Sequence, residues 1–377
     1  MATTFRYANR DEYGRISRFL HDHWANNHVY CRDKPLFDWT FDRRSEWCED
    51  GYSFALAEDD GELVGILGGI PFSFNCFGRR SHGVWIANWV ISPEHRRGPT
   101  ALKLLSTFRR PDFQPVVAFG INAATVPVYK ILRGEVLPAA PRYFAVLPGA
   151  AGRMARLISL ANPSWSAERA QELAERLVLE RSGVKRPIAG SAIPADWDEA
   201  NWVEIAERTV GAARDKAYLS WRYLAHPRFQ YRVIAVPEGR RTGLLVWRLE
   251  TIHRQVDGQL WAVDDVGRIV EFLPASPEGA RLLVNELLAQ LATCGALGAD
   301  FYGFHGPTRT LLVEEGFADL STIADHTAIP SRFQPLDGKG GDILSAMFLP
   351  PDVPPCTLAP DCPWYWTKSD SDQDRPN

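Results

Sequence analysis

Long apolar segments are absent from this chain of 377 residues. No run approaches the roughly 18 apolar residues that a helix needs to cross a membrane. The first ten residues, Met-Ala-Thr-Thr-Phe-Arg-Tyr-Ala-Asn-Arg, also lack the apolar core of a secretory signal peptide. The sequence therefore predicts a cytoplasmic protein without a membrane partner.

Cysteine is scarce and scattered. The six cysteines form no Cys-x-x-Cys pair, and none stands at zinc-site spacing from a histidine; they are Cys31, Cys48, Cys76, Cys294, Cys356 and Cys362. We interpret them as the reduced thiols of a cytoplasmic protein, and we expect no metal site.

An excess of positive charge is missing as well. Lysine and arginine number 42 against 46 aspartates and glutamates, which gives a net charge of -4 with the nine histidines neutral. Because no long basic run exists, we expect no nucleic-acid partner. The composition, 45% hydrophobic and 23% charged, is that of an ordinary globular protein, and the length suits two domains rather than one core.

The most informative stretch is 84–105, Val-Trp-Ile-Ala-Asn-Trp-Val-Ile-Ser-Pro-Glu-His-Arg-Arg-Gly-Pro-Thr-Ala-Leu-Lys-Leu-Leu. An apolar strand leads into a basic turn of small residues, and the turn opens an amphipathic helix. Backbone N–H groups, a helix N-terminus, Arg96 and Arg97 converge on one point, which is how proteins hold a pyrophosphate. The turn is not a P-loop, because the spacing and the terminal Lys-Ser/Thr are missing. It is not a Gly-x-Gly-x-x-Gly dinucleotide loop either.

This turn resembles the coenzyme A loop of the GCN5-related N-acetyltransferases (GNAT), which follows Arg/Gln-x-x-Gly-x-Gly/Ala. Leu104 and Leu105 fix Ala101 as the sixth loop position and Arg96 as the first. The fourth position is then Pro99, where the family usually has Gly and where proline has no N–H to donate.

The resemblance implies that acyl-CoA, as acetyl-CoA or a short hydroxyacyl-CoA, is the co-substrate. It implies that the carrier's amides pair with the strand around Trp89, Val90 and Ile91. It also implies that the carrier's phosphates bind the loop formed by Arg96, Arg97, Gly98, Pro99, Thr100 and Ala101.

The order of elements gives the fold class. Strands are expected at 5–7, 52–57, 63–74, 85–91, 116–121 and 143–147, with helices between them. Pattern alone predicts an α/β protein, and the resemblance implies a mixed central sheet. A similar order restarts in the second half with low residue identity, which we interpret as a tandem duplication of GNAT-like domains. The predicted domains are 1–148, which binds acyl-CoA; 149–195, a helical linker; 196–349, a GNAT-like pseudo-domain; and 350–377, a tail.

Two residues of the first half match a second family pattern, an Asn followed seven residues later by a Tyr. Asn122 and Tyr129 have this spacing, although Gly134 comes one residue later than usual. The resemblance implies that Asn122 caps the helix and binds the pantetheine arm, and that Tyr129 protonates the departing thiolate. A plain N-cap and a packed helix residue are the structural alternatives.

The second half lacks both features. Leu312 stands where the tyrosine belongs, and the segment 273–277, Leu-Pro-Ala-Ser-Pro, has no arginines. We therefore expect the second half to keep the fold and to have lost the carrier site, which leaves one site per chain.

The acceptor is expected at the interface of the two halves, a common place for ligands. His305, His28, Asp264 and Asp265 are the candidate bases or acceptor ligands. His305 could instead make a local hydrogen bond, and the two aspartates could bond a neighbouring loop. His21, His23 and His28 lack the carboxylate or cysteine that would complete a metal site.

Further stretches, at 27–28, 217–223 and 226–227, resemble bacterial tandem acyltransferases found with exopolysaccharide and O-antigen sugar enzymes. The polar tail 365–377 also resembles their ending, although its composition alone would leave it disordered. The resemblance implies acyl transfer to the amine of a nucleotide-linked deoxyamino sugar, with Arg222 or a neighbouring aromatic residue binding the nucleotide and Asp370 of the acidic tail over the sugar.

Transfer is expected to be direct, because no cysteine lies in the motifs. Two alternatives stay open: an aminoacyl transferase of the peptidoglycan-bridge type, and a non-catalytic acyl-CoA-binding protein. The oligomeric state also stays open, with a homodimer as one option.

Overall fold

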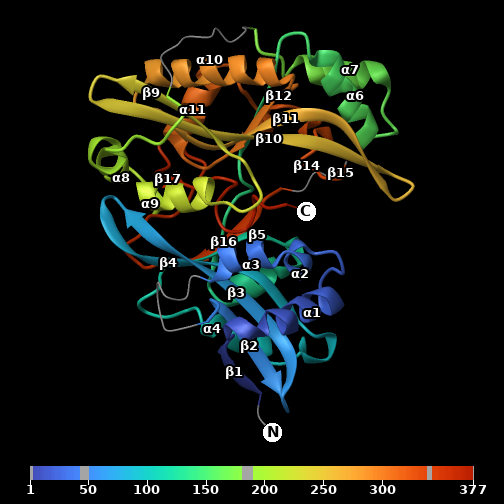
Figure 1. The fold of residues 1–377 in the computed structure, drawn as a ribbon, viewed down its shortest axis with the longest axis vertical. Helices are drawn as coiled ribbons and strands as arrows, with labels where there is room; N and C mark the ends of the chain where they lie inside the picture. The colour runs from blue at the N-terminus through green and yellow to red at the C-terminus, as the bar shows by residue number, and fades with distance from the viewer. Residues whose placement is uncertain (1–2, 43–50, 181–189, 338–341, 377) are drawn as a thin grey trace.

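The computed structural model describes residues 3–42, 51–180, 190–337 and 342–376. Two lobes, each built on a β-sheet, lie one above the other, and segments near the C-terminus run between them (Figure 1). The predicted α/β class with mixed sheets is confirmed. No helix of the described residues is long and apolar enough to cross a membrane.

The first lobe contains a nine-stranded sheet with the order β1-β2-β3-β4-β5-β16-β6, extended by β8 beside β3 and by β17 beside β8. Its strands are β1 (Thr4–Tyr7), β2 (Phe54–Asp59), β3 (Glu62–Cys76), β4 (Arg79–Ile91), β5 (Val116–Ile121), β6 (Glu135–Val136), β8 (Val210–Ala212), β16 (Leu344–Phe348) and β17 (Trp364–Tyr365). Its helices are α1 (Tyr13–His23), α2 (Val29–Arg32), α3 (Lys34–Phe41), α4 (Thr100–Ser106) and α5 (Val126–Ile131).

Alternation along β4 explains how both faces of this sheet are covered. Trp85 and Ala87 belong to the apolar cluster that includes α1 to α3, whereas Val84 and Ile86 belong to the cluster that includes α4 and α5. Successive side chains of a strand point to opposite faces, so the sheet carries a core on each side.

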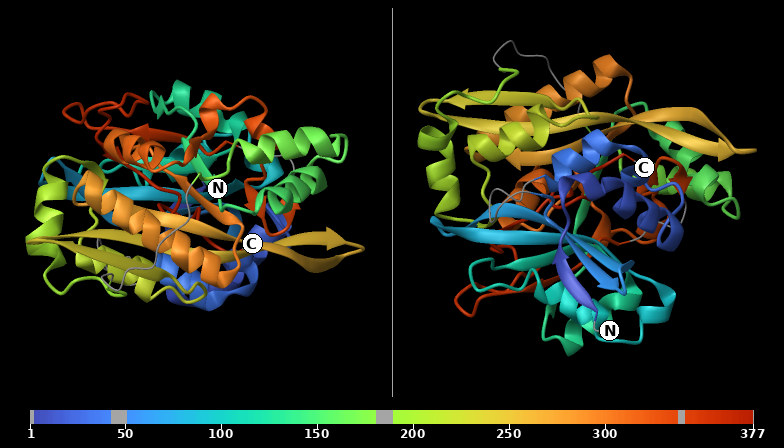
Figure 2. Two further views of the ribbon diagram at one scale, coloured as in Figure 1. Left: turned by 90° about the horizontal axis from the view of Figure 1, so that it is seen from above. Right: turned by 60° about the horizontal axis from the view of Figure 1, so that its bottom comes forward.

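The second lobe contains a six-stranded sheet with the order β13-β7-β12-β11-β10-β9. Its strands are β7 (Arg142–Val146), β9 (Arg232–Glu238), β10 (Arg241–Val256), β11 (Gln259–Leu273), β12 (Gly298–Tyr302) and β13 (Ala318–Asp319). Helices α6 (Ala151–Ala161), α7 (Ala167–Glu175), α10 (Pro277–Cys294) and α11 (Gly306–Glu314) pack with it, and α10 lies along its outer face (Figure 2).

Short elements complete the chain. They are α8 (Val203–Ala206), α9 (Lys216–Leu219), two π-helical turns (Asp198–Trp202 and Ser220–Leu224), and the hairpin of β14 (Arg332–Phe333) with β15 (Leu336–Asp337). The 3-10 turns are Arg10–Glu12, Pro93–His95, Ala123–Thr125, Leu320–Thr322 and His326–Ala328.

The two sheets share a connectivity. In the first, β2, β3 and β4 are antiparallel and β5 is parallel to β4; in the second, β9, β10 and β11 are antiparallel and β12 is parallel to β11. The two halves therefore share a strand order, while their origin in a tandem duplication stays a prediction.

The predicted domain boundaries are wrong for two strands, because the lobes exchange them. Strand β7, assigned to the first domain, pairs with β12 and β13 of the second sheet, and β16, assigned to the second domain, pairs with β5 and β6 of the first. Both strands are almost wholly buried. A strand buried on both faces carries no pattern that identifies its partner sheet.

The segment 149–195 also differs from a free linker, since Met154, Leu157 and Leu173 of α6 and α7 enter the core of the second lobe. Five cysteines of the described residues are free thiols, and Cys48 lies outside those residues.

The tail is ordered rather than disordered. Ser369, Asp370 and Ser371 have no exposed surface. Composition misleads here because the polar side chains of the tail find buried partners in the second lobe.

Candidate active site

Strands β4 and β5 separate partway along their length. They pair in parallel only at Val84 with Val116, Trp85 with Val117 and Ile86 with Ala118. Strand β4 continues to Ile91 without a partner from β5 among the described residues, while its other edge stays paired with β3. The edge from Ala87 to Ile91 therefore presents unpaired backbone groups to any ligand that lies between the two strands.

A β-bulge changes the direction of β4 where it separates from β5. Gly68 of β3 pairs with Ala87 and Ile66 pairs with Val90, so Asn88 and Trp89 together oppose a single residue of β3. Asn88 adopts a left-handed φ of 54°. Among the described residues, Asn88 Nδ2 and Trp89 Nε1 are buried without a hydrogen-bond partner. Bulges of this kind often lie beside functional sites, and the two unpaired donors are available to a ligand or to water.

The predicted phosphate loop follows this edge and is open to solvent. Arg96, Arg97, Gly98 and Pro99 are all exposed. Arg96 Nε donates a hydrogen bond to the Ile91 carbonyl, 3.2 Å away, which holds the guanidinium beside the end of β4.

Helix α4 begins directly after the loop. Its first backbone bond runs from the Lys103 N–H to the Pro99 carbonyl, at 3.0 Å. The N–H groups of Thr100, Ala101 and Leu102 precede that bond and lack an intrahelical partner. Pro99 stands at the N-cap, where its missing N–H removes no helical bond.

Tyr129 lies on α5 beside the separated strands. Its ring centroid is 6.0 Å from that of Trp89 and 6.2 Å from that of Phe348, and the residue is 3% exposed. No described residue makes a hydrogen bond to its hydroxyl. Burial raises the pKa of Tyr129, so the phenol stays protonated and can donate a proton.

Asn122 stands at the end of β5, where its Oδ1 accepts a hydrogen bond from the Ala124 N–H at 2.9 Å. This is the predicted N-cap. The residue also lines a cavity of about 620 Å³ between the lobes. Asn122 can thus cap the helix and also lie beside a ligand in the cavity.

This interlobe cavity is lined by charged and polar side chains from both lobes and from the tail. The lining comprises Trp24, Gly120, Ile121 and Asn122 of the first lobe; Arg248, Glu250, Arg268, Tyr302, Ser331, Arg332, Phe333, Asp342 and Ile343 of the second half; and Lys368, Gln373, Asp374 and Arg375 of the tail. Such a lining suits a hydrophilic acceptor.

Ion pairs fix most of the charges in this cavity. Arg248 bonds Asp374 at 2.6 Å and Glu250 at 3.0 Å, while Arg268 bonds Glu250 at 2.5 Å and Asp300 at 3.0 Å. Burial alone would raise the pKa of Glu250, but Arg268 and Arg248 lower it to about 2. The carboxylate is therefore ionised and weakly basic.

The tail carboxylate that lines this cavity is Asp374 rather than the predicted Asp370. Asp370 pairs with Arg214 at 2.7 Å, accepts a hydrogen bond from the Tyr218 hydroxyl at 3.1 Å, and has no exposed surface. Its role is to hold the tail in the core.

Three other predicted acceptor residues do not line the interlobe cavity. Asp264 pairs with Arg153 of helix α6, and Asp265 accepts a hydrogen bond from Thr251 of strand β10 at 2.7 Å, so each carboxylate has a structural partner, although neither partner lies in a loop. Arg222 is only 1% exposed and lies beside the rings of Trp39 and Trp221, at 5.2 and 5.7 Å. Neighbouring aromatic rings bury its guanidinium away from this cavity.

His28 lies behind the rim of the cavity. Its Nδ1 accepts a hydrogen bond from the Tyr30 N–H at 3.3 Å, and its Nε2 lies 3.5 Å from Arg375 of the cavity lining. Burial, reinforced by Arg375, lowers the pKa of His28 to about 4. The imidazole is thus a weak base.

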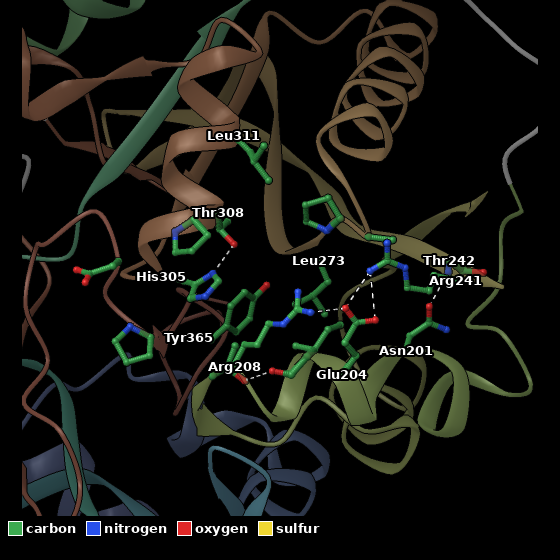
Figure 3. A pocket seen from close by; sticks show the side chains of 17 residues that line it. Asn201, Glu204, Arg208, Arg241, Thr242, Leu273, His305, Thr308, Leu311 and Tyr365 are labelled. Atoms are coloured by element: carbon green, nitrogen blue, oxygen red, sulfur yellow. Dashed lines mark hydrogen bonds and ion pairs between the residues drawn. The ribbon is translucent and has the colours of Figure 1, made fainter. Parts of the chain in front are cut away.

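His305, predicted as a base, lines a different cavity of about 270 Å³ in the second half. Figure 3 shows its ring beside Tyr365 and bonded to Thr308, at 2.8 Å. Burial, with a further contribution from Arg309, lowers the pKa of His305 to about 4. His305 stands at the N-cap of α11, after the end of β12, and does not line the interlobe cavity; the local hydrogen bond that the sequence allows is present.

That second cavity lies where the repeat would place a second carrier site, and the tail occupies the gap between β11 and β12. These strands pair only at Gly267–Ile269 with Ala299–Phe301. Beyond that point, the Tyr365 hydroxyl accepts a hydrogen bond from the Phe272 N–H at 3.0 Å, and the Trp366 carbonyl accepts one from the Phe304 N–H at 3.2 Å. The chain's own tail thus satisfies the strand ends in this half.

The sequence reasoning missed several residues of the interlobe cavity, chiefly Lys368, Arg248 and Arg268. Lys368 stands in the tail two residues after the aromatic segment 364–366, and this proximity was the available signal. The two arginines are inward-facing charges on long strands, and no local pattern distinguishes them.

Comparisons with known proteins bear on the fold. Residues 17–107 match the profile of the Acetyltransferase (GNAT) family, a segment that runs from within α1 to the end of α4. No curated protein sequence matches the chain.

Solved structures share the fold across 92% of this chain. A GCN5-related N-acetyltransferase from Anabaena variabilis is 12% identical over 72% of its own length, with a TM-score of 0.53. One from Kribbella flavida is 15% identical over 71%, with a TM-score of 0.51. The N-myristoyltransferase of Saccharomyces cerevisiae with bound myristoyl-CoA is 12% identical over 82%, with a TM-score of 0.52. At these identities the likeness establishes the fold, which is that of the GNAT acetyltransferases.

Proposed function

We propose that this protein is an N-acyltransferase that takes its acyl group from acyl-CoA at one site, between β4 and β5. The observation that carries the proposal is the unpaired edge of β4 from Ala87 to Ile91, which the Asn88–Trp89 bulge opens. The yeast N-myristoyltransferase, which has the same fold, binds myristoyl-CoA, and this supports an acyl-CoA carrier here.

The residues present fit such a carrier. The unpaired strand edge can pair with the amides of the pantetheine arm, and the loop from Arg96 to Ala101, exposed over Arg96–Pro99, can bind the diphosphate. When bound, the carrier supplies a thioester whose carbonyl an amine can attack. The acyl group is proposed to be acetyl or a short hydroxyacyl group.

The acceptor is proposed to be the amine of a nucleotide-linked deoxyamino sugar, bound in the interlobe cavity. Support comes from the size of the cavity, about 620 Å³, and from its charged walls, which suit a large hydrophilic molecule. The resemblance of 217–223 and of the tail to sugar-modifying acyltransferases points the same way.

Two residues have assigned roles in this proposal. Tyr129, kept protonated by burial, donates a proton to the thiolate as the carbon–sulfur bond breaks. Asn122 holds the end of β5 where the carrier and the acceptor cavity meet. Transfer is direct, since no cysteine lies in the described segments that border the carrier.

A thiol-release assay tests this function. Acetyl-CoA and hydroxybutyryl-CoA are each incubated with the protein and a panel of nucleotide-linked amino sugars, and free thiol is measured. We expect release that depends on one class of acceptor. Tyr129→Phe should lower kcat by about 100-fold or more while the Kd for CoA stays within twofold. An equal loss of turnover and of CoA affinity would show that Tyr129 is structural.

A further inference from the structure

Lys368 has an unusual position in the tail. Its side chain lines the interlobe cavity, with Nζ 5.0 Å from the centroid of the Tyr302 ring. The structure gives Nζ no hydrogen bond and no ion pair with any described residue. The flanking residues are held firmly: Thr367 bridges to Gly303, and the Ser369 hydroxyl lies 2.7 Å from that of Tyr223. The backbone therefore presents an unpaired amine to the cavity.

The carboxylates nearest to Lys368 are already engaged by other cations. Arg248 and Arg268 share Glu250, and Arg268 also bonds Asp300. Asp374 accepts hydrogen bonds from Arg248 and from the Tyr231 hydroxyl, at 2.6 Å from each. None of these carboxylates is left to pair with Lys368 or to act as a base.

The remaining charges of the lining lie toward the outside of the cavity. Arg332 and Asp342 are exposed, and Arg375 pairs with Asp372 at 2.7 Å. The first lobe contributes only uncharged side chains to the lining, including Asn122. Among the described residues of this lining, Lys368 thus carries the one amine, and the other titratable groups that face it there are the carboxylates, Tyr302 and the arginines.

The surroundings favour the neutral form of this amine. Burial and the nearby Arg268 lower the pKa of Lys368, whereas Asp300, Glu250 and Asp374 oppose that shift, and the result is a pKa of about 7. A large fraction of Lys368 is therefore unprotonated near neutral pH.

We infer that Lys368 is the general base of the acyl transfer, taking a proton from the acceptor's ammonium group in the interlobe cavity. This inference rests on the proposed function and supplies its missing base. An alkylammonium has no lone pair and cannot attack a carbonyl, so an acceptor that binds in its protonated form needs a base in the cavity. His28 and His305 do not meet this need, because one lies behind the rim and the other lies in the second cavity.

The protons of the step balance. The Lys368 amine takes one proton from the ammonium, and the freed nitrogen attacks the thioester carbonyl. The carbon–nitrogen bond forms, the carbon–sulfur bond breaks, and Tyr129 gives its proton to the sulfur. The second proton lost by nitrogen replaces the one that Tyr129 gave, and Lys368 releases its proton to solvent.

The first test measures the amine itself and needs no acyl-CoA. The full-length protein is labelled with trace acetic anhydride between pH 5 and 10, and each lysine is quantified by mass spectrometry, with the exposed Lys130 as reference. We expect the labelling of Lys368 to reach half its maximum near pH 7, well below the reference lysine. Labelling that rises in parallel with Lys130 would overturn the inference.

The second test measures the reaction with the acceptor found by thiol release. Lys368→Met should lower kcat at pH 7 by about 100-fold or more and remove the rise of kcat/KM near pH 7, with the KM for acyl-CoA within twofold. Lys216→Met, which loses only a hydrogen bond to the Ala195 carbonyl, is the matched control.

A charge-preserving variant separates a base from an anion-binding group. Lys368→Arg should be as slow as Lys368→Met, because arginine stays protonated. Recovery of turnover with arginine would show that the residue binds an anionic part of the acceptor, and the inference would be wrong. If the wild-type protein releases no thiol with any acceptor, the proposed function fails. If it does release thiol while Lys368→Met keeps kcat and the pH profile, only the assignment of the base fails.

Discussion

Replacing Arg214 with methionine tests whether the tail is an integral part of the fold. Arg214 Nε lies 2.7 Å from Glu271 of β11, and Nη2 lies 2.7 Å from Asp370 of the tail. All three side chains have no exposed surface. One buried cation therefore ties the tail to the second sheet and balances two carboxylates.

The expected cost is large because both carboxylates lose their cation. Removing one partner of a buried ion pair typically costs about 3–5 kcal/mol. With a urea slope of about 3 kcal/mol/M for a chain of this size, the unfolding midpoint of Arg214→Met should fall by about 1 M or more. Because methionine fills much of the space of the arginine side chain, the loss of stability is due to the missing charge rather than to a new cavity.

The same change predicts a pH dependence with a definite sign. Burial already raises the pKa of Glu271, and Arg214 opposes that shift. Without the arginine, the folded-state pKa of Glu271 should lie well above its unfolded value. The contribution of Glu271 to stability is then greatest below its unfolded pKa, near 4, and is lost as pH rises through the folded-state pKa. The loss of unfolding free energy in Arg214→Met, relative to the wild-type protein, should therefore be smaller at pH 5.5 than at pH 8.

Urea titrations followed by tryptophan fluorescence measure both effects. Arg79→Met, which removes an exposed pair with Asp352, is the control and should leave the midpoint unchanged within error. A midpoint for Arg214→Met equal to that of the control, at both pH values, would refute the placement of the tail.

Two further predictions concern the second half. Gly306→Ala should destabilise the protein by about 1–3 kcal/mol in a thermal or urea transition, because its Cβ would lie 2.1 Å from the carbonyl oxygen of Pro360 in the tail. Gly152→Ala, with no atom within 4 Å of the added carbon, should instead stabilise helix α6 by up to about 1 kcal/mol, and equal effects would contradict the packing of the tail. His305→Gln should leave kcat within twofold and the pH–rate profile between pH 6 and 9 unchanged, because His305 has a pKa of about 4 and lies in the second cavity. If His305→Gln loses turnover while its stability is unchanged, His305 would again be a candidate for the general base.

Local patterns were enough to predict most of the first half. The stretch 116–121 reads as an apolar strand and is β5, and the basic turn after Ile91 opens α4 as expected. Both features follow from patterns among residues that are close in sequence. These patterns are the alternation of side chains, a proline at the start of a helix and a cluster of small residues. The position of Asn122 at a helix start follows from the same local logic.

The acceptor cavity could not be predicted in the same way, because contacts between distant segments form it. The tail approaches β5 where Gln373 Nε2 donates to the Phe119 carbonyl at 2.9 Å, across more than 250 positions in sequence. Gly120, with a left-handed φ of 78°, leaves the space that Gln373 fills. A single sequence does not show that Gly120 and Gln373 are in contact. The exchange of β7 and β16 could not be predicted for the same reason, because it also depends on contacts between segments that are distant in sequence.

The misassigned aspartates illustrate a related difficulty. Asp264, Asp265 and Asp370 are acidic residues in plausible places, yet each is engaged in an internal bond. A sequence shows which residues can ionise but not which of them have buried partners. Lys368 is the reverse case, since its surroundings leave its amine unpaired among the described residues.

The location of bound coenzyme A tests the central claim most directly. A crystal structure of the protein with CoA should show the pantetheine arm along Ala87–Ile91 of β4 and the diphosphate at the loop from Arg96 to Ala101. A carrier found in the second-half cavity beside His305, or away from β4 altogether, would contradict the account.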